Sequence, residues 1–212
     1  MVCTYTAISS DVLQELNLFA EYSAASYCTN NLNSTGTKLT CATGNCPTVE
    51  KAETNTLYEF SQYVDDATCR YTREKLTIAP SLRTTEFGDV AGFLAVDTTN
   101  QLLVLSFRGT RSVDTWIANL DFAQEDIHDV CDGCSAHGGW WKSWQSVVDV
   151  LPSKIEAAVT DYPDYKLVFT GHSFGGALAI LGGTALRNAG YTIDLVRASN
   201  AIETSILALK QC

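Results

Sequence analysis

Basic residues, histidines and long apolar runs are all scarce in this chain of 212 residues. Its 14 Lys and Arg face 24 Asp and Glu, and the net charge of −10 argues against nucleic acid, which needs a basic surface. No run approaches the roughly 18 apolar residues of a membrane-spanning helix. The first residues lack the basic and apolar regions of a secretion signal, so we expect no signal peptide in this sequence.

Repeats, low-complexity tracts and linker-like stretches are also missing, which favours a single domain with one sizeable core. Cysteine, by contrast, is abundant, and eight cysteines favour an oxidising compartment. The sequon Asn33-Ser34-Thr35 accepts a glycan only if the chain is secreted. The cysteine content and the sequon fit a secreted protein, whereas the missing secretion signal does not.

The stretch from Thr170 to Gly176 contains Gly-x-Ser-x-Gly, the pattern of a nucleophile elbow, with Ser173 at its centre. Residues 166–170 are typical of a short buried strand, and the apolar residues after Ser173 recur with the period of a buried helix. Gly190 stands where that helix is expected to end. Because strand, glycine-flanked serine and helix follow in this order, we favour a catalytic serine over a simple tight turn.

Two further segments have the apolar spacing of amphipathic helices. One covers residues 11–27, and the capping-box spacing of Asp11 and Gln14 predicts where it starts. The other covers residues 143–160, and Pro152 predicts a kink or a break inside it. The residues expected to face inward are Val12, Leu13, Leu16, Phe19, Ala20 and Tyr22 in the first, and Val147, Val148, Leu151, Ile155, Ala158 and Val159 in the second.

Strands are predicted over residues 90–96 and 102–107, with a hairpin turn over 97–100 between them, and another strand begins at Ile193. Strands that alternate with helices predict an α/β fold with a largely parallel central sheet. In such sheets the functional site lies at the carboxyl ends of the strands, and the predicted elbow lies at such an end.

Four cysteines occur in closely spaced pairs. Cys41 and Cys46 lie in a polar, glycine-containing loop that suits a local disulfide. Cys131 and Cys134 form a Cys-x-x-Cys pattern, but zinc would need a second ligand pair and none follows. A thioredoxin-like redox motif would open a helix after a strand, whereas this pattern lies in a glycine-rich loop. A structural disulfide is therefore favoured.

Two other segments leave alternatives open. Residues 61–85 hold four of the 14 basic residues, and we favour a solvated insertion over a binding patch. Residues 113–120 have apolar side chains at helical spacing, which fits either a helix packed on the core or a mobile lid.

Taken together, the chain resembles the fungal secreted triacylglycerol lipases of the class 3 lipase family, over roughly residues 8–62 and 86–195. The resemblance rests on stretches that include Leu105-Ser106-Phe107-Arg108-Gly109-Thr110-Arg111-Ser112 and residues 165–179. It implies an α/β-hydrolase fold and hydrolysis of acylglycerol esters at a lipid–water interface, without a cofactor or metal. It also implies an extracellular protein.

The resemblance also assigns roles to residues. Ser173 matches the nucleophile, and the backbone N–H groups of Thr110 and Phe174 match the oxyanion hole, with the Thr110 hydroxyl assisting. The Cys41–Cys46 and Cys131–Cys134 pairs match two family disulfides. Residues 113–120 match the lid, whose apolar side chains are Val113, Trp116, Ile117 and Leu120.

The chain departs from the family in two regions. Residues 61–85 are longer than the family connection and add Cys69. The match stops near Leu195, before the segments on which the family carries its catalytic Asp and His. We therefore expect residues 1–195 to form a partial α/β-hydrolase domain that lacks the C-terminal strands, and residues 196–212 to be an unrelated tail. The pairing of the remaining cysteines stays open: Cys3, Cys28, Cys69 and Cys212.

A serine needs a base, and the chain has only three histidines. The family uses the equivalent of His172 structurally, and we expect His128 and His137 to be surface or loop residues rather than substitute bases. Without a base a serine hydrolase retains only about 10³–10⁴-fold catalysis over water. Alternatives to a triacylglycerol lipase are a phospholipase, a feruloyl esterase, or a protein that binds lipid surfaces without catalysis.

Overall fold

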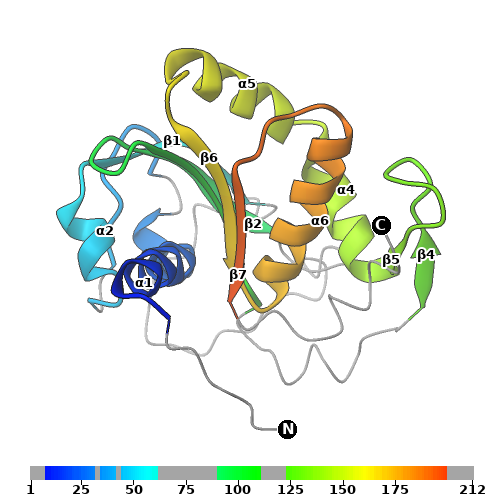
Figure 1. The fold of residues 1–212 in the computed structure, drawn as a ribbon, viewed down its shortest axis with the longest axis horizontal. Helices are drawn as coiled ribbons and strands as arrows, with labels where there is room; N and C mark the ends of the chain where they lie inside the picture. Colours follow the sequence, from blue (N-terminus) through cyan, green and yellow to red (C-terminus); the bar gives the residue numbers. More distant parts are fainter. Residues whose placement is uncertain (1–7, 32–33, 42–43, 62–89, 111–122, 200–212) are drawn as a thin grey trace, which may run out of the picture.

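A computed structural model describes residues 8–31, 34–41, 44–61, 90–110 and 123–199. A central five-stranded sheet separates two layers of helices, with α1 and α2 on one side and α4, α5 and α6 on the other (Figure 1). The strands of this sheet are β1 (Thr54–Ser61), β2 (Ala91–Asp97), β3 (Leu102–Phe107), β6 (Lys166–His172) and β7 (Leu195–Ser199). The helices are α1 (Ser10–Ala25), α2 (Pro47–Lys51), α4 (Gly138–Val148), α5 (Leu151–Asp161) and α6 (Phe174–Asn188), with a 3-10 turn η1 (Thr29–Asn31). A hairpin of β4 (Gln124–Asp126) and β5 (Ser135–His137) forms a separate small sheet.

The central sheet is mixed, with the strand order β1-β2-β3-β6-β7. β2 is antiparallel to both of its neighbours, while β3, β6 and β7 are parallel to one another. All strands except β2 therefore run in the same direction, which confirms the predicted α/β fold with a largely parallel sheet. In the register of β3 and β6, Phe107 is opposite Gly171, so the end of β3 lies beside the first glycine of the serine motif.

The core has two parts because successive strand residues face opposite sides of the sheet. The larger part lies between the sheet and the helices α4, α5 and α6, and Trp140 and Trp144 of α4 are its largest fully buried side chains. The smaller part lies under α1 and includes Phe19, Tyr22 and Phe93. Helix α6 packs against β6 and β7, so the helix that follows Ser173 is fixed in place by the parallel strands.

Helix α1 differs from its prediction in how much of it is buried. Ser9, rather than Asp11, is its N-cap, and the Ser9 hydroxyl accepts a hydrogen bond from the Val12 N–H at 3.3 Å. Phe19 and Tyr22 are buried as expected, but the predictions for Val12, Leu13, Leu16 and Ala20 are wrong, because all four are exposed. The described sheet contacts only the C-terminal half of the helix, where Phe19, Tyr22, Ser23 and Ala25 are the buried residues.

The predicted helix over 143–160 is interrupted as Pro152 indicated. Helix α4 ends at Val148 and α5 starts at Leu151, with Pro152 in the first turn of α5. Backbone N–H groups in a first turn have no partner within the helix, so the missing N–H of Pro152 costs no hydrogen bond. Val147, Leu151, Ile155 and Ala158 are buried as expected. Val159 is 39% exposed, so its predicted inward position is wrong.

A buried pair of polar side chains anchors α1 to the sheet. The Tyr22 hydroxyl donates a hydrogen bond of 2.6 Å to Oδ2 of Asp97, which ends β2. Asp97 also accepts from the backbone N–H and the side-chain amide of Asn100, and both Tyr22 and Asp97 are fully buried. Burial is the main cause that raises the pKa of Tyr22 far above its ordinary value, and the Asp97 carboxylate adds to it.

Stability is expected to fall as the pH rises above about 10, the ordinary tyrosine pKa. There the unfolded chain loses the Tyr22 proton while the folded chain keeps it, so the free energy of unfolding decreases with pH. The Tyr22→Phe variant lacks this proton, and its stability should fall less steeply, by about 1.4 kcal/mol per pH unit. Urea unfolding from about pH 8 to about pH 11 measures both slopes. Equal slopes would contradict the expectation.

Candidate active site

Ser173 is the single residue between strand β6 and helix α6. Its backbone has φ 55° and ψ −121°, a conformation that costs a residue with a Cβ of order 1–3 kcal/mol. Hydrogen bonds on both sides maintain it: the Ser173 N–H donates to the Ser199 carbonyl at 3.0 Å, and the Ser173 carbonyl accepts from the Ala177 N–H at 3.1 Å. The predicted sequence of strand, sharp turn and helix is thus present.

The glycines beside Ser173 are required by close backbone contacts. A Cβ on Gly171 would lie 2.3 Å from the carbonyl carbon of Gly175, across the turn. A Cβ on Gly175 would lie 2.2 Å from the Phe107 carbonyl oxygen at the end of β3. Neither backbone can give way without moving a central strand or α6 itself. The pattern Gly-x-Ser-x-Gly therefore lets the first turn of α6 sit directly against β3.

The loop after β3 lies against the same turn. A Cβ on Gly109 would lie 2.6 Å from the His172 carbonyl oxygen, so this loop touches the residue before Ser173. Thr110 follows Gly109, and its hydroxyl oxygen is buried with no hydrogen-bond partner in the described part of the chain. Phe174, whose ring is buried, begins α6, where the positive end of the helix dipole favours negative charge. The structure thus brings Thr110, Ser173 and Phe174 to one end of the sheet.

The three histidines have three different environments. Nδ1 of His172 lies 3.0 Å from the Tyr27 hydroxyl. His137 is only 7% exposed and stacks on Trp140, with ring centroids 4.5 Å apart, so the expectation that it is a surface or loop residue is wrong. It ends the short strand β5 directly before α4, and its ring packs on Trp140 of that helix. His128 is exposed and lies 3.8 Å from Asp126. Within the described residues, none of them is hydrogen bonded to the Ser173 hydroxyl.

Two disulfides are present at the positions that the sequence indicated. Cys41 and Cys46 are joined with a Cα–Cα distance of 5.9 Å, in the loop that leads into α2. Cys131 and Cys134 are joined with a Cα–Cα distance of 5.4 Å, in the turn between β4 and β5. Disulfides of this kind persist in oxidising compartments.

Several predicted features lie outside the described residues. They include the expected lid residues Val113, Trp116, Ile117 and Leu120, most of the basic segment 61–85, the sequon residue Asn33, and Cys3, Cys69 and Cys212. Across the ranges that are described, no group of three His, Cys, Asp or Glu side chains is placed to bind a metal ion. None of the described helices is both long and apolar enough to cross a membrane.

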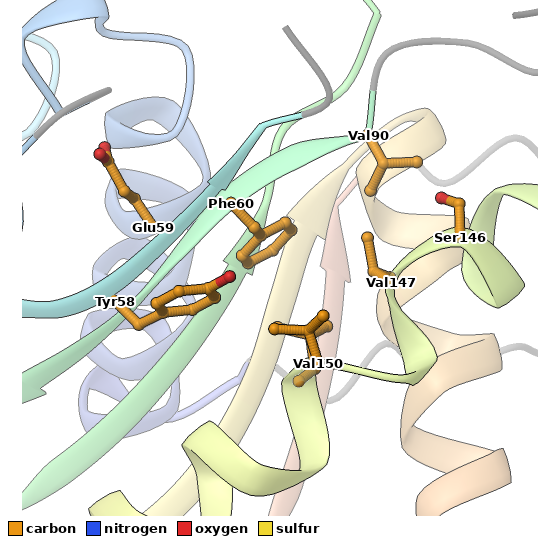
Figure 2. Close-up of a pocket in the computed structure, with 8 residues that line it drawn as sticks. Tyr58, Glu59, Phe60, Val90, Ser146, Val147 and Val150 are labelled. Carbon is orange, nitrogen blue, oxygen red and sulfur yellow. The ribbon is translucent and has the colours of Figure 1, made fainter. Parts of the chain in front are cut away.

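A cavity of about 230 Å³ lies away from these residues, between β1 and the junction of α4 and α5. Figure 2 shows Tyr58 and Phe60 of β1 on one side of it and Val147 and Val150 on the other. Its wall is completed by Glu59, Val90, Ser146 and Leu151. None of these residues belongs to the serine turn or to the loop after β3, so the cavity is not part of the candidate site.

Tyr27 is the residue of this site that the sequence did not point to. Its hydroxyl bonds to His172, and a Cβ on Gly109 would lie 1.9 Å from that hydroxyl. Burial raises the pKa of Tyr27, opposed by a hydrogen bond from the Gly109 backbone and by the charge of Arg108. No local pattern could have revealed it, because Tyr27 is about 80 residues before Gly109 and about 145 before His172.

A strained serine at the carboxyl end of a parallel strand, followed at once by a buried helix, is the backbone geometry expected of an elbow in an α/β-hydrolase fold. Comparisons with known proteins agree. Residues 104–201 match the profile of the class 3 lipases, and residues 3–58 match that of the lipase 3 N-terminal region. The chain belongs to the class 3 lipase family.

Individual relatives include fungal secreted lipases. The chain is 37% identical over 185 residues to the secreted mono- and diacylglycerol lipase A of Penicillium cyclopium, covering 87% of this chain and 53% of that protein. It is 29% identical over 188 residues to the secreted mono- and diacylglycerol lipase 1 of Fusarium solani, covering 89% of this chain and 49% of that one. The chain thus spans about half the length of the curated relatives it matches.

Solved structures show the same fold. A crystal structure of a mutant MDLA from Penicillium cyclopium superposes with a TM-score of 0.74 at 35% identity, covering 89% of this chain and 62% of that one. The mono- and diacylglycerol lipase from Aspergillus oryzae superposes with a TM-score of 0.70 at 35% identity, covering 87% of this chain and 60% of that one.

Proposed function

We propose that this chain is an ester hydrolase that acts on acylglycerols through an acyl-serine intermediate on Ser173. The observation that carries the proposal is the Ser173 backbone, held at φ 55° between a buried strand and a buried helix. Such strain persists only where surrounding structure maintains it, and it lifts a serine side chain away from the strand and the helix. The hydroxyl is hydrogen bonded to no side chain in the part of the molecule described.

The chemistry follows from the groups around that serine. The Ser173 oxygen bonds to the ester carbonyl carbon and gives its proton to a base, and the carbonyl oxygen becomes an oxyanion. The backbone N–H groups of Thr110 and Phe174 would bind this oxyanion, and the buried Thr110 hydroxyl would assist. The alcohol then leaves with a proton, and water cleaves the acyl-serine to release the fatty acid. No step needs a metal or a cofactor.

The base that must take the Ser173 proton is the part of this mechanism that the described histidines support least. His172 is engaged by Tyr27, His137 is stacked on Trp140, and His128 is exposed beside Asp126. We therefore expect slow turnover from the 212-residue chain, about 10³–10⁴-fold over water, the level that a serine hydrolase retains from its oxyanion hole and binding alone.

Acylglycerols are the proposed substrates because two relatives are named mono- and diacylglycerol lipases. We further propose that the chain works outside the cell at a lipid–water interface. Two disulfides support the compartment. The interface is proposed from the resemblance of residues 113–120 to the family's lid, a segment that lies outside the described residues.

Covalent labelling tests the proposal without relying on fast turnover. The full chain is incubated with a short-chain p-nitrophenyl phosphonate ester, which serine nucleophiles attack at phosphorus with release of nitrophenol. We expect one phosphonyl group per chain, attached at Ser173 by peptide mass spectrometry, and none in Ser173→Ala. Wild type and Ser173→Ala that remain equally unlabelled would overturn the proposal and favour a protein that binds lipid without catalysis. Hydrolysis of emulsified diolein, phosphatidylcholine and a feruloyl ester then ranks the substrate classes.

A further inference from the structure

Tyr27 reaches the candidate site from the far end of helix α1. The helix ends at Ala25. The Ser26 hydroxyl donates to the Ser23 carbonyl at 2.7 Å and also lies 3.4 Å from the Phe107 carbonyl oxygen, so the helix end lies over the end of β3. The Tyr27 N–H donates to the Ala24 carbonyl at 3.1 Å, so the backbone of Tyr27 continues the last turn. Its side chain is thereby directed to the loop after β3 and to the serine turn.

The Tyr27 hydroxyl contacts the two backbone segments that carry the expected reacting groups. On one side it lies 3.0 Å from Nδ1 of His172, the residue before Ser173. On the other side it packs on Gly109, the residue before Thr110, so closely that a Cβ there would lie 1.9 Å from it. The two segments also touch each other, because the same Cβ would lie 2.6 Å from the His172 carbonyl oxygen.

Burial determines the protonation state of the Tyr27 hydroxyl in this contact. Burial raises the pKa of Tyr27, so its hydroxyl keeps its proton at neutral pH. The Gly109 backbone and the Arg108 charge oppose that rise. The Tyr27 hydroxyl and Nδ1 of His172 form one hydrogen bond, in which the tautomer of His172 decides which group donates.

We propose that Tyr27 is a positioning residue that sets the distance between the Ser173 nucleophile and the oxyanion-hole amide of Thr110. The inference rests on the proposed function of Ser173. Ser173 follows His172 and Thr110 follows Gly109, the two residues that the Tyr27 hydroxyl contacts. Losing the hydroxyl therefore lets the loop after β3 and the serine turn separate. A displacement of about 1 Å between reacting groups lowers a rate by about 100-fold. Because the hydroxyl does not touch the ester in this proposal, reagent binding should change little.

The Tyr27→Phe variant of the full chain tests this role and keeps the aromatic ring. With saturating phosphonate, we expect the maximal rate of Ser173 labelling to fall about 10-fold to 100-fold, while the concentration for half-maximal rate stays within about twofold. The matched control is Tyr22→Phe, which removes the buried tyrosine hydroxyl of α1, bonded to Asp97 rather than to the site. After correction for the folded fraction measured by thermal unfolding, its labelling rate should stay within about twofold of wild type.

Nuclear magnetic resonance of the histidine rings supplies a measurement that needs no reaction. The chain has only three histidines, so long-range ¹H–¹⁵N spectra resolve each ring. We expect His172 in the wild type as a single tautomer, held by the hydrogen bond between Nδ1 and the Tyr27 hydroxyl. In Tyr27→Phe the Nδ1 resonance should shift toward that of a ring free to exchange tautomers, while Tyr22→Phe should leave it unchanged.

The outcomes separate the two proposals. Labelling of Ser173 at equal rates in wild type and Tyr27→Phe would overturn the positioning role and leave the proposed function standing. His172 ring resonances that are the same in wild type and Tyr27→Phe would also overturn it, because the hydroxyl would then not hold the ring. If the wild type is labelled no more than Ser173→Ala, the proposed function fails and the positioning role fails with it, whatever the His172 spectrum.

Discussion

Gly175→Ala is expected to destabilise the chain by at least about 3 kcal/mol, a large share of the 5–15 kcal/mol that holds a domain folded. The added Cβ would lie 2.2 Å from the Phe107 carbonyl oxygen and 2.9 Å from the Arg108 carbonyl carbon. Both are backbone atoms at the end of the central strand β3, so no side-chain rotation relieves the contact. Relief requires α6 to move away from β3, and this also displaces Ser173 from Thr110.

Urea unfolding measures the loss, and Gly139→Ala is the matched control. Gly139 is also in the first turn of a helix, α4, but a Cβ there meets only the His137 ring, at 3.4 Å. This control should be neutral or more stable by up to about 1 kcal/mol, because alanine favours the helix. Similar stability of the two variants would show that α6 does not need its close contact with β3.

Asp97→Ala is the second substitution with a large expected effect, a loss of about 1.5–3 kcal/mol in the free energy of unfolding. The Asp97 carboxylate is fully buried and accepts three hydrogen bonds, from the Tyr22 hydroxyl and from two N–H groups of Asn100. Alanine leaves the Tyr22 hydroxyl buried without an acceptor, and it frees the turn that joins β2 to β3.

The exposed carboxylate Asp164 provides the control, since Asp164→Ala should change stability by less than about 0.5 kcal/mol. The double variant Tyr22→Phe with Asp97→Ala gives a sharper measurement. It should be less destabilised than the sum of the two single variants, because each single change already breaks the shared hydrogen bond. Additive losses would mean that this bond contributes little to the anchoring of α1.

Sequence patterns predicted the elements that are defined by residues close together in the chain. Strands β3 and β6 contain the apolar runs 102–105 and 167–169, as expected of strands buried on both faces. By contrast, β1 was not predicted, because its fully buried positions include Thr54 and Thr56 rather than apolar residues. A break in register between Thr56 and Tyr58 further disrupts the alternation along β1. Only pairing with β2 makes this segment a strand.

The sequence by itself determined the serine turn, because the glycines, the strand and the helix that define it lie within 25 consecutive residues. It also indicated the two disulfides, each closed over a separation of five residues or fewer. The tertiary structure decided which face of α1 is buried and how His137 is enclosed. It also brought Tyr27 between Gly109 and His172. These contacts join residues from distant parts of the chain, and their geometry is set by how α1 crosses the sheet, which no local spacing encodes.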